Sequence, residues 1–176
     1  MRVHLLRQRM LLLVQQLLAF YTIEIIEPNW HELERKLHEA QSVDEFMKHH
    51  FDFLNTCRKE CMLTDYRYLE CHRKLMNTIT AFTESKLRFA EQCEAMQQAV
   101  DAWYERGDET APPPALVDEG DILTKIEASW NKHSRTFRDV VNLLSTTDNP
   151  AALPLAYRLQ TTLRSVSYTH LRAHET

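Results

Sequence analysis

Apolar residues recur every three or four positions along most of this chain, which is the spacing of one face of an α-helix. The pattern predicts five principal helices, separated by breaks near Pro28, Gln41, Thr64 and residues 107–120. No segment shows the alternation of apolar and polar residues that is typical of a half-buried strand. We therefore expect an all-α fold, an up-and-down helical bundle of about five helices, in which short connections make neighbouring helices antiparallel.

The predicted boundaries depend on proline and on capping residues. Pro28 should end the first helix, because proline lacks the backbone N–H that a helix interior needs. Asn29 and Ser42 are candidate N-caps of the second and third helices. Each is followed three residues later by a glutamate, Glu32 or Glu45, which can close a capping box.

Each predicted helix carries an apolar stripe that we expect in the core. The first has Leu6, Met10, Leu13, Leu17, Phe20 and Glu24, widened by Leu5, Leu12, Ala19 and Ile23. The third has Val43, Phe46, His50, Phe53, Leu54, Cys57 and Cys61. The main stripe of the very long fourth helix, residues 66–106, contains Leu69, His72, Met76, Ile79, Thr83, Lys86, Ala90, Cys93, Gln97, Val100 and Tyr104. A second strip beside it contains Leu75, Phe82, Phe89, Met96 and Trp103. The fifth helix has Leu123, Ile126, Trp130, His133, Phe137, Val140 and Leu144.

Composition narrows the classes of partner. The net charge of −4 gives no general attraction to nucleic acid or to an anionic membrane, so neither is an expected partner. The chain has 2 glycines, and both lie in residues 107–120 with three consecutive prolines and several acids. This segment is predicted to be an exposed acidic, Pro-rich linker within the domain. The four cysteines are expected to be reduced thiols, as in a cytoplasmic protein.

The N-terminus imitates a signal peptide, because basic residues precede an apolar run. Gln15 and Gln16 interrupt that run, and no small-residue cleavage site follows. A membrane span over residues 10–26 would have to bury both glutamines and Glu24, which is costly in hydrocarbon. We expect a core helix and no membrane insertion.

Several possible metal ligands lie close together in sequence: His49, His50, Cys57, Cys61, Cys71 and His72. A zinc site needs four convergent ligands, but the adjacent residues Cys71 and His72 point to different helix faces. We therefore favour core cysteines and expect no metal. On the predicted third helix His50 falls on the apolar stripe, where a hydrogen-bonded core histidine is expected, while His49 points outward.

No catalytic residue and no cofactor are predicted. A nucleophile with a base partner, a phosphate-binding glycine loop and an HExxH motif are all missing from the sequence. The three tryptophans, Trp30, Trp103 and Trp130, lie on or beside the helix stripes. Core packing is the first interpretation for each, and an exposed interface anchor is the alternative.

Particular stretches of this sequence resemble the gamma-tubulin complex components. Residues 5–37 are similar to the helix–Pro–helix segment of that family, with Tyr21, Glu24, Ile26, Glu27, Pro28 and Trp30 in its characteristic positions. Residues 42–69 resemble a second family segment through Asp44, His50, Phe53, Leu54, Cys61, Met62, Leu63 and Thr64. A weaker similarity covers residues 142–160, and the subunit-2 type is the preferred match.

The resemblance implies that residues 1–160 are part of a larger helical domain, the second half of the C-terminal gamma-tubulin-binding domain, so that the chain begins inside a longer protein. It implies a non-catalytic scaffold that binds gamma-tubulin and other gamma-tubulin complex components and supports microtubule nucleation. The implied location is the cytoplasm and cytoskeleton, at microtubule-organising centres and spindle poles. No motif marks the gamma-tubulin contact, so no partner-binding residue is assigned.

Residues 161–176 depart from the family. From about Ser165 the sequence SVSYTHLRAHET resembles a translated sequencing-adapter read, and we expect this tail to be non-native or disordered.

The alternative function is a generic helical tethering or coiled-coil subunit of another cytoskeletal or trafficking complex. A sustained a/d seam with flanking charges would favour it. The predicted stripe of the fourth helix instead includes Thr83, Lys86 and Gln97, which suits a globular bundle better. A helical enzyme is a third hypothesis, which any turnover would support.

Overall fold

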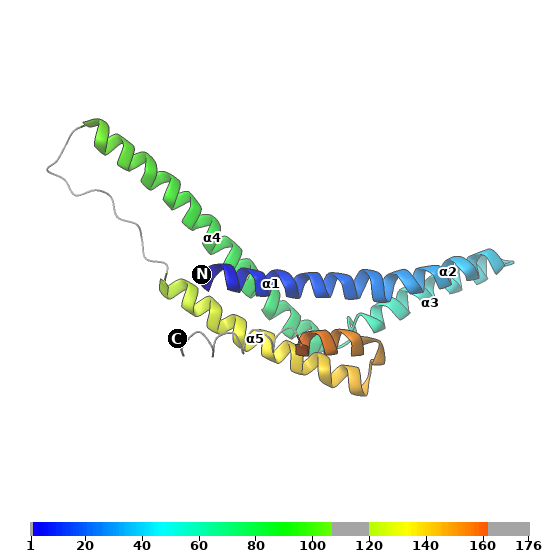
Figure 1. Cartoon of the computed structure of the whole chain (residues 1–176). Helices are drawn as coiled ribbons and strands as arrows, with labels where there is room; N and C mark the ends of the chain where they lie inside the picture. The colour runs from blue at the N-terminus through cyan, green and yellow to red at the C-terminus, as the bar shows by residue number, and fades with distance from the viewer. Residues whose placement is uncertain (1, 107–119, 162–176) are drawn as a thin grey trace. The chain divides into compact units, whose positions relative to one another are not determined.

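The structure is a computed structural model that describes residues 2–106 and 120–161. Across these residues every regular element is helical and none is a strand, which confirms the predicted all-α class (Figure 1). The elements are α1 (Arg2–Ala19), η1 (Phe20–Ile26), α2 (Glu27–Glu39), α3 (Val43–Glu60), α4 (Tyr66–Arg106), α5 (Gly120–Thr147) and η2 (Pro150–Ala152). A last helix covers residues 153–161.

The chain divides into two compact units. Among the described residues, the first comprises 2–73 and 134–161, and the second comprises 74–106 and 120–133. The predicted linker, apart from Gly120 at the start of α5, and the predicted tail beyond Thr161 lie outside the described residues.

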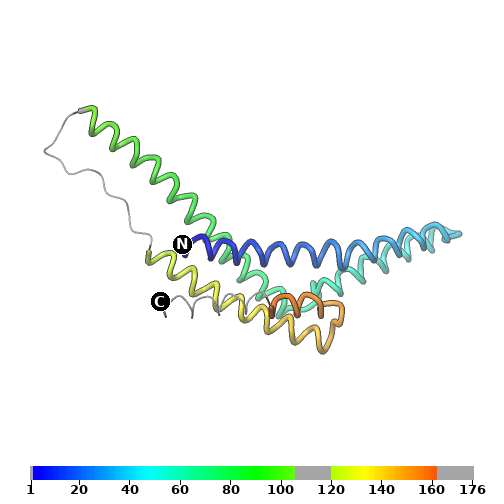
Figure 2. Tube along the Cα trace, in the orientation of Figure 1, coloured from blue at the N-terminus to red at the C-terminus, as the bar shows by residue number. Residues whose placement is uncertain are grey.

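Helices α1, η1 and α2 form one continuous helical segment, so the predicted break at Pro28 is wrong (Figure 2). The segment η1 is a π-helix, and the N–H of Glu27 bonds to the carbonyl of Thr22, five residues earlier. Pro28 follows in the first turn of α2 and lacks the N–H that would bond to a carbonyl of the preceding turn. The π-helical hydrogen bonding therefore lets the helix pass the proline without ending.

The predicted capping box at Asn29 is also wrong, because Asn29 lies inside α2. Its side-chain amide donates a 2.8 Å hydrogen bond to the carbonyl of Ile25 and another of 2.8 Å to a carboxylate oxygen of Glu60. The residue thus joins two helices of the first unit instead of starting one.

The predicted N-cap at Ser42 is confirmed, but Glu45 returns its hydrogen bond to the residue before the cap and so does not close the predicted box. The Ser42 hydroxyl accepts a 3.2 Å hydrogen bond from the N–H of Glu45, whose carboxylate accepts one of 2.8 Å from the N–H of Gln41. Ala40 is extended, with φ −65° and ψ 130°, so α2 ends there and the chain turns back. Helices α2 and α3 consequently form an antiparallel hairpin (Figures 1 and 2).

Helix α1 buries the predicted stripe. Leu6, Met10, Leu13, Leu17 and Phe20 are each at most 4% exposed. Glu24, at the end of this stripe, is half-buried and pairs with Arg158 of the last helix at 2.5 Å. Most of the residues that widen the stripe stay exposed, namely Leu5, Leu12 and Ile23.

In α4 the predicted core stripe is displaced by one residue. The structure buries Tyr68, Cys71, Leu75, Thr78, Phe82 and Ser85, whereas Leu69 and Tyr104 of the predicted main stripe are 41% and 72% exposed. The sequence of α4 carries two adjacent apolar strips. The buried one includes Thr78 and Ser85, whose hydroxyl groups make it less apolar in sequence than the strip beside it. Thr78 and Ser85 satisfy their hydroxyls within the helix, by donating to the carbonyls of Lys74 at 2.9 Å and Phe82 at 3.0 Å.

Helix α5 buries Trp130, Phe137 and Leu144 of its predicted stripe, and Val141 beside them. In the first unit the last helix buries Leu155, Ala156 and Leu159. Gln160 donates a 3.0 Å hydrogen bond to the side-chain oxygen of Asn142, which fixes this helix beside the end of α5.

Candidate protein-interaction surface

Glu60, the last residue of α3, joins three segments of the first unit that are distant in sequence. Its carboxylate accepts the 2.8 Å hydrogen bond from Asn29 of α2. Its backbone oxygen accepts a 2.7 Å hydrogen bond from the side-chain amide of Asn149, which also reaches the carbonyl of Lys59 at 3.2 Å. Asn29, Glu60 and Asn149 come from the three stretches that the sequence singles out, so the fold brings those stretches to one point.

The turn after Glu60 has the hydrogen bonds of a Schellman motif. The N–H of Met62 bonds to the carbonyl of Lys59 at 2.9 Å, and the N–H of Leu63 bonds to the carbonyl of Arg58 at 3.0 Å. Met62 has φ 61°, a left-handed conformation that favours glycine. The methionine side chain is only 2% exposed, so its burial offsets a backbone cost of about 1–2 kcal/mol.

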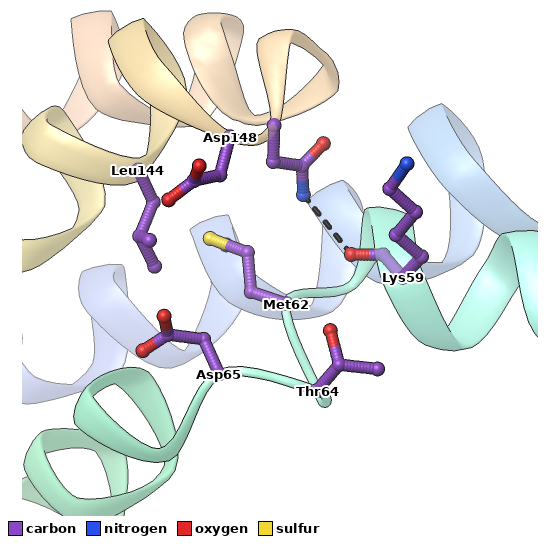
Figure 3. A pocket seen from close by; sticks show the side chains of 7 residues that line it. Lys59, Met62, Thr64, Asp65, Leu144 and Asp148 are labelled. Atoms are coloured by element: carbon purple, nitrogen blue, oxygen red, sulfur yellow. Dashed lines mark hydrogen bonds between the residues drawn. The ribbon is translucent and has the colours of Figure 1, made fainter.

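A cavity of about 230 Å³ lies between this turn and the end of α5 (Figure 3). Its lining residues are Lys59, Met62, Thr64, Asp65, Leu144, Asp148 and Asn149. Arg67 pairs with Asp65 at 2.7 Å and approaches Asp148 at 3.7 Å. The hydrogen bond from Arg67 lowers the pKa of Asp65, which also caps α4 by accepting from the N–H of Tyr68 at 3.0 Å. Because both carboxylates already face a cation of the chain, we assign the cavity no ligand.

Helix α3 presents an apolar face that the described part of the chain leaves exposed. None of its 18 residues is buried, although the sequence predicts a core stripe there. Phe53 and Cys57 of that stripe are half-buried, and only Cys61, just beyond the helix, is buried. We call the exposed residues the α3 face: Val43 (78% exposed), Phe46 (46%), Met47 (53%), Phe51 (63%) and Leu54 (48%).

The α3 face forms one continuous surface, because its members are spaced by about one or two helical turns. His50, which was expected in the core, is exposed among these residues, and His49 is half-buried, so the predicted orientation of the pair is reversed. Near the hairpin tip a groove of about 370 Å³ borders the face at Val43 and Phe46.

The tryptophans separate into core and surface. Trp130 is fully buried, as predicted, and Trp103 is half-buried. Trp30 is 48% exposed, although its ring packs edge-on against Phe53 with centroids 6.0 Å apart. An exposed tryptophan that is held by a neighbouring ring suits an interface anchor, the alternative interpretation.

The candidate metal ligands do not converge. In the described ranges, no group of three or more His, Cys, Asp or Glu side chains could hold a metal ion. Cys61 and Cys71 are buried, and burial raises the pKa of the Cys61 thiol to about 11. Cys71 donates to the carbonyl of Tyr68 at 3.2 Å. His72 packs against the ring of Phe137, and burial lowers the pKa of the His72 imidazole.

The continuous helix Arg2–Glu39 is long and apolar enough to cross a membrane, judged by length and composition alone. Its best 18-residue window has a mean hydropathy of 1.5, and 28% of that window is buried within the chain. The core helix of a soluble protein has the same length and composition. The large apolar residues exposed on the flank opposite Leu5 and Leu12 are Leu11, Val14 and Leu18.

Comparison with known proteins identifies the family. The gamma tubulin complex component C-terminal family matches residues 1–162. The spindle pole body component alp4 of Schizosaccharomyces pombe is 33% identical over 155 residues, which are 88% of this chain and 19% of alp4. Gamma-tubulin complex component 2 of Mus musculus is 35% identical over 61% of this chain and 12% of its own length. The component 2 homolog of Drosophila melanogaster is 47% identical over 36% of this chain and 8% of its own length.

These matches confirm both the expected family and the preferred subunit type. Component 3 of Homo sapiens is also similar, at 28% identity over 127 residues, which is lower than the component 2 proteins. The chain spans about a fifth or less of the length of these relatives. Because the family match covers all of the described residues, the chain belongs to the gamma-tubulin complex component C-terminal family.

Proposed function

We propose that this chain is a non-catalytic scaffold part of a gamma-tubulin complex subunit, which binds gamma-tubulin and supports microtubule nucleation. Its further partners are other gamma-tubulin complex components. Its location is the cytoplasm and cytoskeleton, at microtubule-organising centres and spindle poles. The names of the relatives, gamma-tubulin complex components and a spindle pole body component, support this proposal.

The α3 face carries the proposal. Large exposed apolar patches mark interaction surfaces, because monomeric proteins bury most such residues. Here the patch contains Phe46, Met47 and Phe51 on one helix, and Trp30 lies on the neighbouring helix. Aromatic and methionine side chains are enriched in protein interfaces. We assign gamma-tubulin to this face.

The hydrogen bonds of Glu60 support the assignment, because they hold the α2–α3 hairpin in place. They fix the last turn of α3 to Asn29 on one side and to Asn149 on the other. A surface on such a tethered helix is presented in one orientation, which reduces the entropy lost on binding.

The exposed flanks of α1 are assigned to another contact, with further helices of the same domain. Leu11 and Leu18 are 46% and 59% exposed on one side of the buried stripe, and Leu5 and Leu12 are 36% and 37% exposed on the other. Since the curated relatives are at least five times longer than the matched region, we assign these flanks to helices of the same domain outside this sequence.

A pull-down of purified gamma-tubulin tests the proposal, with the complete C-terminal domain as bait. The double variant Met47→Asp/Phe51→Asp should lower binding at least about tenfold, because it charges the centre of the α3 face. The matched control is Leu87→Asp/Tyr104→Asp, which charges two residues of α4 that are 61% and 72% exposed. The control should bind like the parent domain.

Three outcomes would contradict the proposal at different levels. Undiminished binding by the α3 variant would place the gamma-tubulin contact on another surface. A folded parent domain that ignores gamma-tubulin would remove the functional assignment, and the helical tethering subunit would take its place. Any catalytic turnover would contradict the non-catalytic role.

A further inference from the structure

The second unit contains a groove between α4 and α5 that the proposed function does not use. It has a volume of about 310 Å³. Its lining residues are Lys74, Asn77, Thr78 and Ala81 from α4, and Lys125, Ile126, Ser129 and His133 from α5. These eight residues include two lysines and a histidine but no carboxylate.

Hydrogen bonding fixes the tautomer of His133. The Thr78 hydroxyl donates its single proton to the carbonyl of Lys74 at 2.9 Å. It must therefore accept from Nδ1 of His133, which lies 2.8 Å away. With Nδ1–H engaged in this way, Nε2 is the ring nitrogen that a ligand can reach, and it becomes a donor when the ring is protonated.

The charges around the groove favour an anion. Lys74 and Lys125 stand on opposite walls. Burial is the main cause of the lowered pKa of His133, and the positive charges of Lys132 and Lys74 lower it further. An anion in the groove would be attracted by these lysines and would stabilise the protonated imidazole.

The remaining surface of the groove is apolar. Ile126 and Ala81 face it from the two helices. An inorganic anion would leave these side chains in water, whereas an acidic residue with an aliphatic neighbour would cover them. The combination of cationic and apolar walls is therefore complementary to a peptide and not to a bare ion.

We infer that this groove binds an acidic peptide segment of a partner protein, with a Glu or Asp carboxylate between Lys125 and His133 and an aliphatic side chain against Ile126. The site lies wholly in the second unit and is separate from the α3 face of the first.

Fluorescence anisotropy tests the inference on the 176-residue chain. The probe is a fluorescein-labelled, amidated peptide of Glu, Leu and Ala, and the matched probe has Gln in place of every Glu. The Glu probe should bind at least about tenfold more tightly, and more tightly at about pH 6 than at about pH 8, because protonated His133 adds a donor and a charge. Inorganic phosphate should compete only weakly.

Two variants locate the site. Lys125 is exposed, so Lys125→Gln should fold normally and weaken binding of the Glu probe about tenfold. Lys86→Gln removes the same charge from α4 outside the groove and should bind like the parent. The NMR titration of His133 gives a second readout, since its pKa should rise when the Glu probe is added and stay unchanged with the Gln probe.

Equal binding of the two probes would overturn the inference, as would equal losses in Lys125→Gln and Lys86→Gln. Complete displacement of the Glu probe by phosphate, at an affinity as high as the peptide's own, would show a simple anion site instead of a peptide groove. None of these results depends on whether the chain binds gamma-tubulin.

Discussion

Asn149 donates a 2.7 Å hydrogen bond from its side-chain amide to the backbone carbonyl of Glu60, across 89 residues of sequence. The bond ties the turn after α5 to the end of α3. Asn149 is only 7% exposed and also donates to the carbonyl of Lys59, so its loss would leave two carbonyl oxygens without their side-chain donor.

Replacement of Asn149 by alanine should therefore lower the free energy of unfolding by about 1–3 kcal/mol, the cost of an unsatisfied buried polar group. Asn149→Asp should cost at least as much, because a carboxylate cannot donate and would face two carbonyl oxygens. Guanidinium denaturation measures both. Asn142→Ala, which removes an exposed hydrogen bond with Gln160, is the control and should cost less than about 1 kcal/mol. An Asn149→Ala protein as stable as this control would contradict the structural role of the bond.

At position 62 a glycine variant should be more stable than an alanine variant, which is the reverse of the order in a helix interior. Both Met62→Ala and Met62→Gly lose the buried side chain and should be less stable than the parent. In a helix interior glycine is the worse of the two by about 1 kcal/mol. At φ 61° glycine has no steric penalty, so Met62→Gly should be more stable than Met62→Ala by about 1 kcal/mol. Thermal or chemical unfolding compares the pair, and a more stable alanine variant would show that the turn relaxes out of the left-handed region.

Deprotonation of the Cys61 thiol should lower the free energy of unfolding at alkaline pH. Burial raises the pKa of its thiol to about 11, above the value of about 9 expected in the unfolded chain. Between these values the folded state holds more protons, so stability is fully present below about pH 9 and is lost as the pH rises toward 11.

Unfolding free energies at about pH 8 and pH 10.5 give the measurement. Cys61→Ala should lose less stability than the parent between these two pH values, whatever its stability at pH 8. Some loss should remain in the variant, because burial also raises the pKa values of Tyr21 and Tyr68. Identical losses in parent and variant would show that the Cys61 thiol titrates normally.

Substitutions in the buried stripe of α1 and on its exposed flank should have different effects on folding and solubility. Residues 1–160 alone should bind gamma-tubulin weakly or not at all, and the complete domain should recover both solubility and binding. Leu17→Asp should unfold either protein, because Leu17 is 4% exposed. Leu18→Asp, at 59% exposure, should leave residues 1–160 folded and make them more soluble, but should destabilise the complete domain. Circular dichroism and sedimentation measure these effects, and a complete domain that is indifferent to Leu18→Asp would contradict the assigned covering of this flank.

The sequence by itself determined the helical class and most helix boundaries. The apolar period predicts the buried residues of α1 and three of those in α5, namely Trp130, Phe137 and Leu144, and Ser42 with Glu45 predicts the start of α3. These features are local, since capping and periodicity depend on residues within one or two turns of each other. The family resemblance also rests on short local stretches, and the comparisons confirm it.

Tertiary structure decided what local patterns leave open. The π-helical pairing that carries the chain past Pro28 is not encoded in proline's own preference, which is to end a helix. In α4 two adjacent strips compete, and the choice of Leu75 and Phe82 over Leu69 depends on packing that periodicity does not specify. In α3 a stripe of ordinary core composition is left exposed. Periodicity shows which residues share a face, but only the position of the other segments determines whether that face is covered, and for this reason the candidate interaction surface emerges from the structure alone.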